Sequence, residues 1–187
     1  MAKKKSKAKP KKKHRLLKLL VLLGAAGGAY SYFKNKQEAA VAPDLSPEER
    51  VTVRDQESIS GLGAIMQSLI GEFVKNPAKV RLLNTMNVSV AIEPREQPET
   101  AITMEFRNGR VLIQPGAVNP DIKISCDMEV LLQMAQMGAG LDAVKYLMTP
   151  EGKKIIEKMM SGELKITGVA AHPVGMMKFS QFLAPAA

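Results

Sequence analysis

Side chains that could carry out catalysis are scarce in this chain of 187 residues. It has two histidines: His14 lies in a lysine-rich stretch, and His172 stands directly before Pro173. A serine or cysteine nucleophile needs a nearby base, and only one histidine is left for the folded part. Cys126, the one cysteine, ends a predicted strand and is better explained as a small packed residue than as a nucleophile. We therefore expect that the protein is not an enzyme.

The acidic residues and glycines form no recognisable site for a metal or cofactor. Asp121, Asp127 and Glu129 are scattered, and they suit solvated loop positions better than a cation site. Gly61 and Gly63 lack the preceding strand and the third glycine of a dinucleotide fingerprint. A lone cysteine can form neither an intramolecular disulfide nor a cysteine-rich metal site. We expect no metal and no cofactor.

Most of the net charge of +9 comes from the first residues of the chain. Ten of the 27 Lys and Arg lie in residues 1–18, where there is no acid, and the rest of the chain is close to neutral. Aromatic residues are only 4% of the chain, which leaves few rings for stacking on bases. We expect no nucleic-acid partner for the folded part. A basic arm that binds nucleic acid remains an alternative for the tail alone.

An apolar run follows the basic residues. Residues 16–33 would span about 27 Å as a helix, close to the ~30 Å hydrocarbon core of a bilayer. Nine Lys and Arg precede this run, and only Lys34 and Lys36 follow it closely. By the positive-inside rule we predict a cytoplasmic tail at 1–15, a single-pass signal anchor at 16–33, and the domain on the far side of the membrane. A cleaved export signal is the alternative.

The next segment, 34–58, is rich in Ala, Pro and alternating charge and is predicted to be a linker. Within it, Ser46, Pro47 and Glu49 are the residue types expected at the N-cap, first and third positions of a short helix. Residues 59–187 have the patterns of one folded domain, described next.

Hydrophobic periodicity predicts the elements of that domain. Spacings of three and four residues indicate helices, and alternation indicates strands. Asn108-Gly109 is the residue pair expected in a tight hairpin turn. We predict an α+β fold with a five-stranded sheet and helices on one of its faces. The expected strands are at 88–92, 101–107, 110–114, 122–126 and 163–168, and the expected helices at 59–74, 78–86, 128–137, 141–148, 150–160 and from 173 onward.

The order of these elements and several short motifs resemble the sterol carrier protein 2 domain family. Its members typically have an Asn-Gly-Arg hairpin turn, a Pro-Asp before the next strand, a Gly-Lys-Leu-Lys-Ile-x-Gly strand, and a last helix rich in Met and Leu. The resemblance spans about residues 60–183. The matching positions are Asn108, Gly109, Arg110, Pro120, Asp121, Gly162, Leu164, Lys165, Ile166, Gly168, Met176, Met177 and Phe179.

The resemblance implies that the five-stranded sheet is mainly antiparallel and is covered by helices. Together the sheet and helices would enclose an apolar tunnel for sterols, fatty acyl chains or other lipids. The sequence departs from the pattern in three places. Glu163 stands where the family has Lys, Val169 stands where a polar residue is common, and residues 138–158 are longer than in compact members. We therefore expect an apolar cavity rather than a site specific for sterols.

Methionines are the main candidates for lining such a cavity. Eight of the twelve lie at or after Met128, where flexible side chains suit a deformable apolar pocket. For any one of them, ordinary core packing is the alternative. The candidate lipid-binding residues are Ile65, Leu69, Phe73, Met104, Phe106, Leu131, Met134, Met148, Met159, Met160, Met176, Met177 and Phe179.

These expectations combine into one functional hypothesis. The protein is expected to be a membrane-anchored lipid-binding or lipid-transfer protein that holds a sterol, fatty acyl chain or similar molecule. Its partners are then a hydrophobic ligand and, through residues 16–33, the membrane. The alternative is a non-catalytic accessory or scaffold protein that uses the same fold to bind a protein partner.

Overall fold

The computed structural model describes residues 45–135 and 145–184. The predicted tail, the predicted anchor and most of the predicted linker lie outside these ranges, as do residues 141–144 of the predicted helix at 141–148. Within the described ranges, no helix combines the length and the apolar character needed to cross a bilayer.

A single mixed sheet of six strands forms the base of the molecule, in the order β1-β4-β3-β2-β5-β6. The predicted α+β fold is confirmed, and three of the five strand pairs are antiparallel, but the prediction of five strands is wrong. The sheet has an additional edge strand, β1, and both the β1–β4 and β2–β5 pairs are parallel. The strands are β1 (Val51–Val53), β2 (Val88–Pro94), β3 (Ile102–Arg107), β4 (Arg110–Pro115), β5 (Ile122–Cys126) and β6 (Lys165–Thr167).

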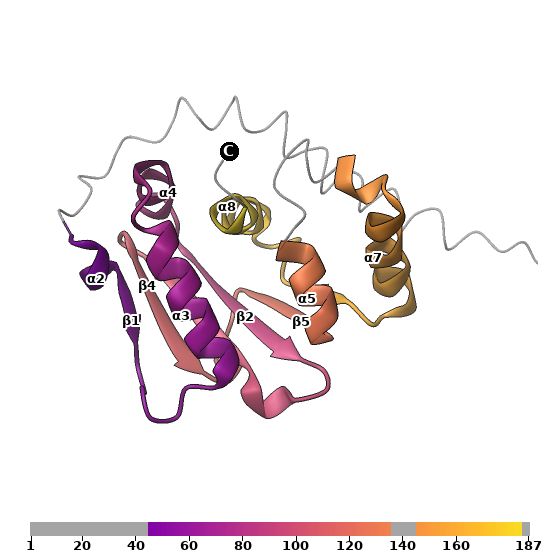
Figure 1. Ribbon diagram of the computed structural model, residues 1–187, viewed down its shortest axis with the longest axis horizontal. Coiled ribbons are helices and arrows are strands. Elements are labelled where there is room, and N and C mark those ends of the chain that lie inside the picture. The colour runs from indigo at the N-terminus through magenta and orange to yellow at the C-terminus, as the bar shows by residue number, and fades with distance from the viewer. Residues whose placement is uncertain (1–44, 136–144, 185–187) are drawn as a thin grey trace, which may run out of the picture.

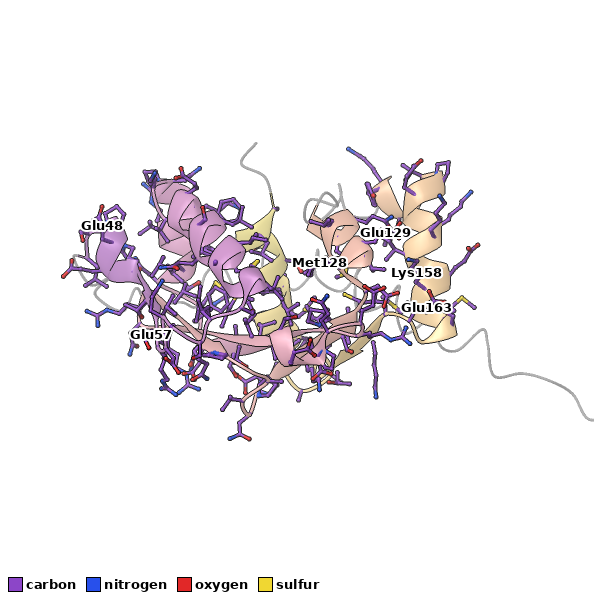
Figure 2. The ribbon with its side chains drawn as sticks, turned by 60° about the horizontal axis from the view of Figure 1, so that its bottom comes forward. Glu48, Glu57, Met128, Glu129, Lys158 and Glu163 are labelled. Carbon is purple, nitrogen blue, oxygen red and sulfur yellow. The ribbon has the colours of Figure 1, made fainter. Side chains whose placement is uncertain are left out.

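The helices all lie on one face of this sheet (Figure 1 and Figure 2). Figure 1 shows α3, α8, α5 and α7 following one another across that face, with α2 and α4 at the α3 end. The short helix predicted from Ser46 is confirmed as α2, whose N-cap Ser46 and Glu49 form a capping box. The bounds are α2 (Pro47–Arg50), α3 (Gly61–Phe73), α4 (Pro77–Leu83), η1 (Pro98–Thr100), α5 (Met128–Ala135), α7 (Pro150–Ser161) and α8 (Pro173–Leu183).

The β3–β4 hairpin has the predicted turn. Asn108 and Gly109 have φ values of 52° and 71°, and Arg107 pairs with Arg110 across the turn. Positive φ at both central positions matches the turn twist to that of the strands. Alternation then points Met104 and Phe106 toward the helices, where both side chains are fully buried.

The chain that joins β4 to β5 crosses the other face of the sheet. The Thr103 hydroxyl donates to the Gly116 carbonyl oxygen (2.7 Å) and accepts from the Val118 amide (2.9 Å). Ser89 and Asp121 exchange two hydrogen bonds, from the Ser89 amide to Asp121 Oδ2 (2.8 Å) and from the Asp121 amide to Ser89 Oγ (2.9 Å). These bonds satisfy buried polar groups of β2 and β3. Because the connection crosses the sheet, β5 lies beside β2 and runs parallel to it.

Candidate apolar binding site

One flank of α3 carries an apolar stripe that runs from solvent into the core. Ile65, Leu69 and Phe73 are spaced by four residues, so they lie along the same side of the helix. Ile65 is 63% exposed and Leu69 is 36% exposed, whereas Phe73 is half-buried. The Phe73 ring meets the Phe182 ring of α8 edge-on, with centroids 5.8 Å apart. The stripe therefore faces α8 rather than the edge strand β1.

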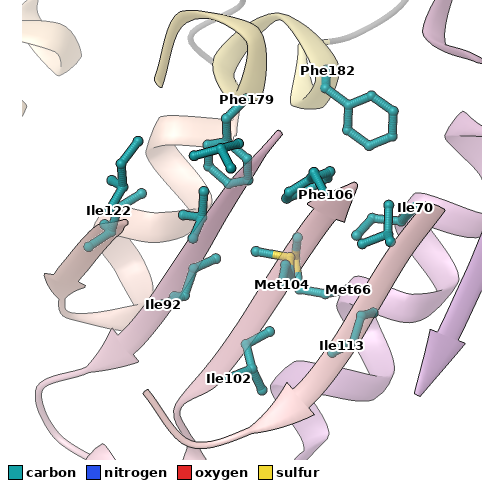
Figure 3. Packing of buried hydrophobic residues seen from close by; sticks show 14 of the residues in the cluster. Met66, Ile70, Ile92, Ile102, Met104, Phe106, Ile113, Ile122, Phe179 and Phe182 are labelled. Atoms are coloured by element: carbon teal, nitrogen blue, oxygen red, sulfur yellow. The ribbon is translucent and has the colours of Figure 1, made fainter. Parts of the chain in front are cut away.

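The floor beneath this stripe is made of buried side chains of the sheet. Figure 3 shows Met104 and Phe106 pointing from β3 toward Phe179 and Phe182 of α8. The Phe106 ring contacts both of these rings edge-on, at centroid distances of 5.7 Å. Such edge-to-face packing adds to the stabilisation gained from buried area alone. Met104, Phe106 and Phe179, three of the predicted site residues, are therefore part of the core in this structure.

On the other side of α8, α5 presents a second apolar flank. Its Val130 is buried against the sheet, while Leu131 and Met134 are half-buried and pack against the core. Glu129 lies on the opposite flank, and its Oε2 is 3.8 Å from Lys158 Nζ of α7 (Figure 2). Leu131, two residues after Glu129, is turned by about 200° from it and so faces away from α7. The flank with Leu131 lies on the α8 side of α5.

A close approach of α8 to the sheet holds this helix between the two flanks. A Cβ added at Gly175 would lie 2.8 Å from a methyl carbon of Val88 in β2, too close for an ordinary contact. Glycine at this position therefore allows α8 to settle against β2. As a result Met176 packs against the core, and Met177 is half-buried.

The remaining predicted residues lie elsewhere. Met160 belongs to α7, which is beyond α5 from α3 (Figure 1), and it is 52% exposed. Met148, just before α7, is 74% exposed, whereas Met159 is half-buried against the core. The structure thus gathers the predicted residues of α3, β3, α5 and α8, and it leaves Met148 and Met160 on the surface of the α7 region.

Sequence reasoning missed two residues of this region. Phe182 is fully buried and contacts both Phe73 and Phe106, and its spacing of three from Phe179 was a usable signal. Leu132 is strongly exposed on α5, two residues from the buried Val130 and therefore on the outward side of the helix. Val130, Leu131 and Leu132 are three successive apolar residues, so their spacing alone does not show which of them is exposed.

Two lysines fix the helices at one end of the site. Lys79 of α4 donates to the Gln181 and Ala184 carbonyl oxygens at the end of α8, and its ammonium lies 5.3 Å from the centre of the Phe73 ring. Lys178 of α8 donates in return to the Thr85 carbonyl oxygen (2.6 Å). Burial lowers the pKa of both lysines. These reciprocal bonds hold α4 and α8 together.

Cys126, Ser89 and His172 carry side chains that could act in catalysis, and their surroundings are described next. Burial, with a further contribution from the Asp127 carboxylate, raises the pKa of the Cys126 thiol to about 11, so the thiol is protonated at neutral pH. His172 Nε2 lies 3.6 Å from Asp121 Oδ1, and the Ser89 hydroxyl accepts from the Asp121 amide, but no hydrogen bond joins Ser89 to His172. In the described part of the chain, no three His, Cys, Asp or Glu side chains gather as a metal-binding group.

Comparison with known proteins gives similarities to solved structures only. No protein-family model and no curated protein matches the chain. A UbiJ-SCP2 ubiquinone synthesis protein is 16% identical, over 65% of this chain and 92% of that one, with a TM-score of 0.45. A sterol carrier protein 2 structure is 14% identical, over 64% and 91% of the two chains, with a TM-score of 0.42.

A third similar structure is a conserved hypothetical protein from Thermus thermophilus, suggested to be a sterol carrier protein. It is 16% identical, over 67% of this chain and 83% of that one, with a TM-score of 0.40. At these identities the similarity concerns the fold. The three structures carry the name of the family that the sequence resembles.

Proposed function

We propose that the protein binds a lipid-like hydrophobic molecule between the apolar flanks of α3 and α5, beside α8 and above the sheet. One observation carries the proposal: the stripe of Ile65, Leu69 and Phe73 continues from solvent into the buried aromatic cluster. A ligand chain lying along this stripe would cover apolar surface that is otherwise in contact with water. Half-buried Met134 and Met176 supply unbranched side chains that can adapt to it.

The magnitude of the driving force supports such a ligand. Burying one methylene is favourable by ~0.8 kcal/mol, so about ten methylenes supply roughly 8 kcal/mol before the costs of ordering. That value corresponds to a dissociation constant of about 1 μM. Because Met104 and Phe106 of the sheet are fully buried whereas Met176 and Met177 of α8 are half-buried, we further propose that chain entry displaces these two methionines rather than the sheet side chains. An enclosed tunnel is part of this proposal.

We also propose that residues 16–33 anchor the protein in a membrane, with residues 1–15 cytoplasmic and the domain on the far side. The support is the apolar run and the charge difference between its two flanks. Carbonate extraction of the full chain with a carboxy-terminal tag tests retention in the membrane. Protease access to the tag from each side tests the orientation, and release of the tagged chain by carbonate would contradict anchoring.

The binding proposal is tested on the full chain in its membrane with a photoactivatable fatty acid. After cross-linking and digestion, the label should appear on peptides that contain α3 and α8. The peptide with Val118, an exposed apolar residue on the opposite face of the sheet, is the internal control. Label confined to residues 16–33, with none on α3 or α8, would contradict the proposal.

A second candidate is a non-catalytic accessory role in which the domain binds a protein partner. Its support is the exposed apolar set of Leu132, Met148 and Met160 on α5 and in the α7 region. Charged substitutions distinguish the two candidates: Ile65→Glu should lower lipid labelling, whereas Met148→Glu should release a partner and leave labelling unchanged.

A further inference from the structure

Two arginines face each other at the tip of the β3–β4 hairpin. Arg107 and Arg110 are directly opposite in the register, and both are exposed. Their neighbours Phe106 and Val111 point into the core, so alternation places both arginines on the face of the sheet that carries no helices. Like charges directly opposite one another destabilise an antiparallel pair. The hairpin therefore keeps an unfavourable pair at its tip.

Within the described residues, this positive charge is not neutralised by a direct partner. Neither arginine side chain forms an ion pair or a hydrogen bond within these residues. Glu105 shares their face of the sheet, but it accepts from Gln114 Nε2 (3.0 Å), whose Oε1 accepts in turn from Arg54 (2.6 Å). The acid on the same strand is thus engaged elsewhere.

A second acid, Glu49, interacts electrostatically with Arg110 and is also engaged elsewhere. Glu49 accepts a hydrogen bond of 2.8 Å from the Ser46 amide, as part of the cap of α2. Hydrogen bonds from Ser46 are the main reason that the pKa of the Glu49 carboxyl is lowered, and the charge of Arg110 contributes less. Arg110 therefore attracts Glu49 from a distance without pairing with it.

The backbone under the two arginines is held in place. Buried Arg50 donates from Nη1 to the Gly109 carbonyl oxygen (3.0 Å) and to Asn84 Oδ1 (3.2 Å), which ties the turn to the ends of α2 and α4. Figure 1 shows this end of β4 beside α2 and α4. Two arginines on a fixed hairpin tip can present their planar donor groups to one anion together.

We propose that Arg107 and Arg110 form a binding site for a phosphate group. Guanidinium groups match phosphate oxygens with paired hydrogen bonds, and the two positive charges balance a doubly charged phosphate. The phosphate can belong to a lipid headgroup or to free phosphate in solution, because the recognised chemistry is the same. The site lies on the open face of the sheet, apart from the apolar site, and does not depend on it.

Calorimetric titration of the full chain in a neutral detergent tests this site with two probes. Inorganic phosphate represents the free anion, and a short-chain phosphatidic acid below its micelle concentration represents the lipid headgroup. The test variant is R107Q/R110Q, and the control is K153Q/K154Q, which removes the same charge from exposed positions of α7. The basic residues 1–18 are unchanged in both, so their contribution to anion binding is constant.

Loss of both arginines should weaken phosphate binding about tenfold, whereas the lysine control should stay within about twofold of the unchanged chain. A third variant, R107K/R110K, keeps the positive charge but lacks the planar guanidinium groups. Its phosphate affinity should lie between those of the arginine-to-glutamine variant and the lysine control. Tighter binding of the lipid probe assigns the site to a headgroup, and equal binding assigns it to free phosphate. Equal losses in the arginine and lysine variants, or no saturable binding of either probe, would overturn the proposal.

Discussion

The ammonium group of Lys79 lies 2.6 Å from the carbonyl oxygen of Ala184 and so caps the end of α8 from a neighbouring helix. The last carbonyl groups of a helix have no partner within it, and a buried cation there satisfies them and interacts favourably with the helix dipole. Through α8, Lys79 also holds the ring contact between Phe73 and Phe182 at one end of the apolar site.

Replacing Lys79 by methionine should lower the free energy of unfolding by about 1–3 kcal/mol, because two partly buried carbonyl acceptors lose a charged donor. Urea denaturation followed by far-ultraviolet circular dichroism measures this loss. Lys75→Met is the matched control: its ion pair with Glu72 is exposed on both sides and should contribute less than about 1 kcal/mol. Equal effects of the two substitutions would show that Lys79 does not cap α8.

Substitution of two glycines should separate backbone strain from steric overlap. Gly162 and Gly168 have φ values of 89° and 84°, so alanine at either position is strained by about 1–2 kcal/mol. At Gly162 an added Cβ meets open space, whereas at Gly168 it would overlap the Asp121 carbonyl oxygen. We expect Gly168→Ala to cost about 2–5 kcal/mol, clearly more than Gly162→Ala. Indistinguishable denaturation midpoints would contradict this close contact.

The Cys126 thiol should make stability depend on pH in the alkaline range. Its pKa is raised from 9.0 to about 11 in the folded chain, so between these values the unfolded chain loses a proton that the folded chain keeps. The contribution of this thiol to the free energy of unfolding is therefore fully present below pH 9. It is lost as the pH rises toward 11, and the loss is on the order of 2 kcal/mol. Cys126→Ala removes this contribution. The difference in unfolding free energy between the two chains should change across that range, and a constant difference would refute the burial of the thiol.

A charge on the exposed part of the apolar stripe should lower ligand binding while leaving the fold intact. Ile65 is 63% exposed, so Ile65→Glu should change the free energy of unfolding by less than about 0.5 kcal/mol. A ligand chain lying on that position would have to desolvate the carboxylate, so affinity for a fluorescent fatty acid should fall at least about tenfold. Val118→Glu on the opposite face is the control. Equal affinity of the two variants would show that α3 is not part of the binding site.

Local residue chemistry was sufficient to predict several features of the fold. Asn108-Gly109 required a turn with positive φ, Thr149 with Pro150 marked the start of α7, and Gly162 ended it in a left-handed conformation. The apolar spacing of α3 likewise predicted its buried face. In each case the residue type constrains the backbone at its own position, so no contact with a distant segment was needed.

The remaining features depend on contacts between distant segments. Val51–Val53 is too short to show a period of two, and its three residues become a strand only by pairing with β4. The parallel placement of β5 follows from a connection that crosses two strands, which no alternation pattern reveals. In the apolar site, the sequence indicated Phe73 and Phe106, but only the packing of α8 shows that both meet Phe182.

The position of β1 has a consequence for mechanical load. Because α2 and β1 come first in the described part and β1 lies at the edge of the sheet, tension applied from the amino-terminal side reaches three residue pairs with β4 and the hydrogen bonds of Arg50 first. These can part while the other strands keep their register. We therefore expect that force applied from the amino-terminal side detaches β1 before the strands beneath α8 separate.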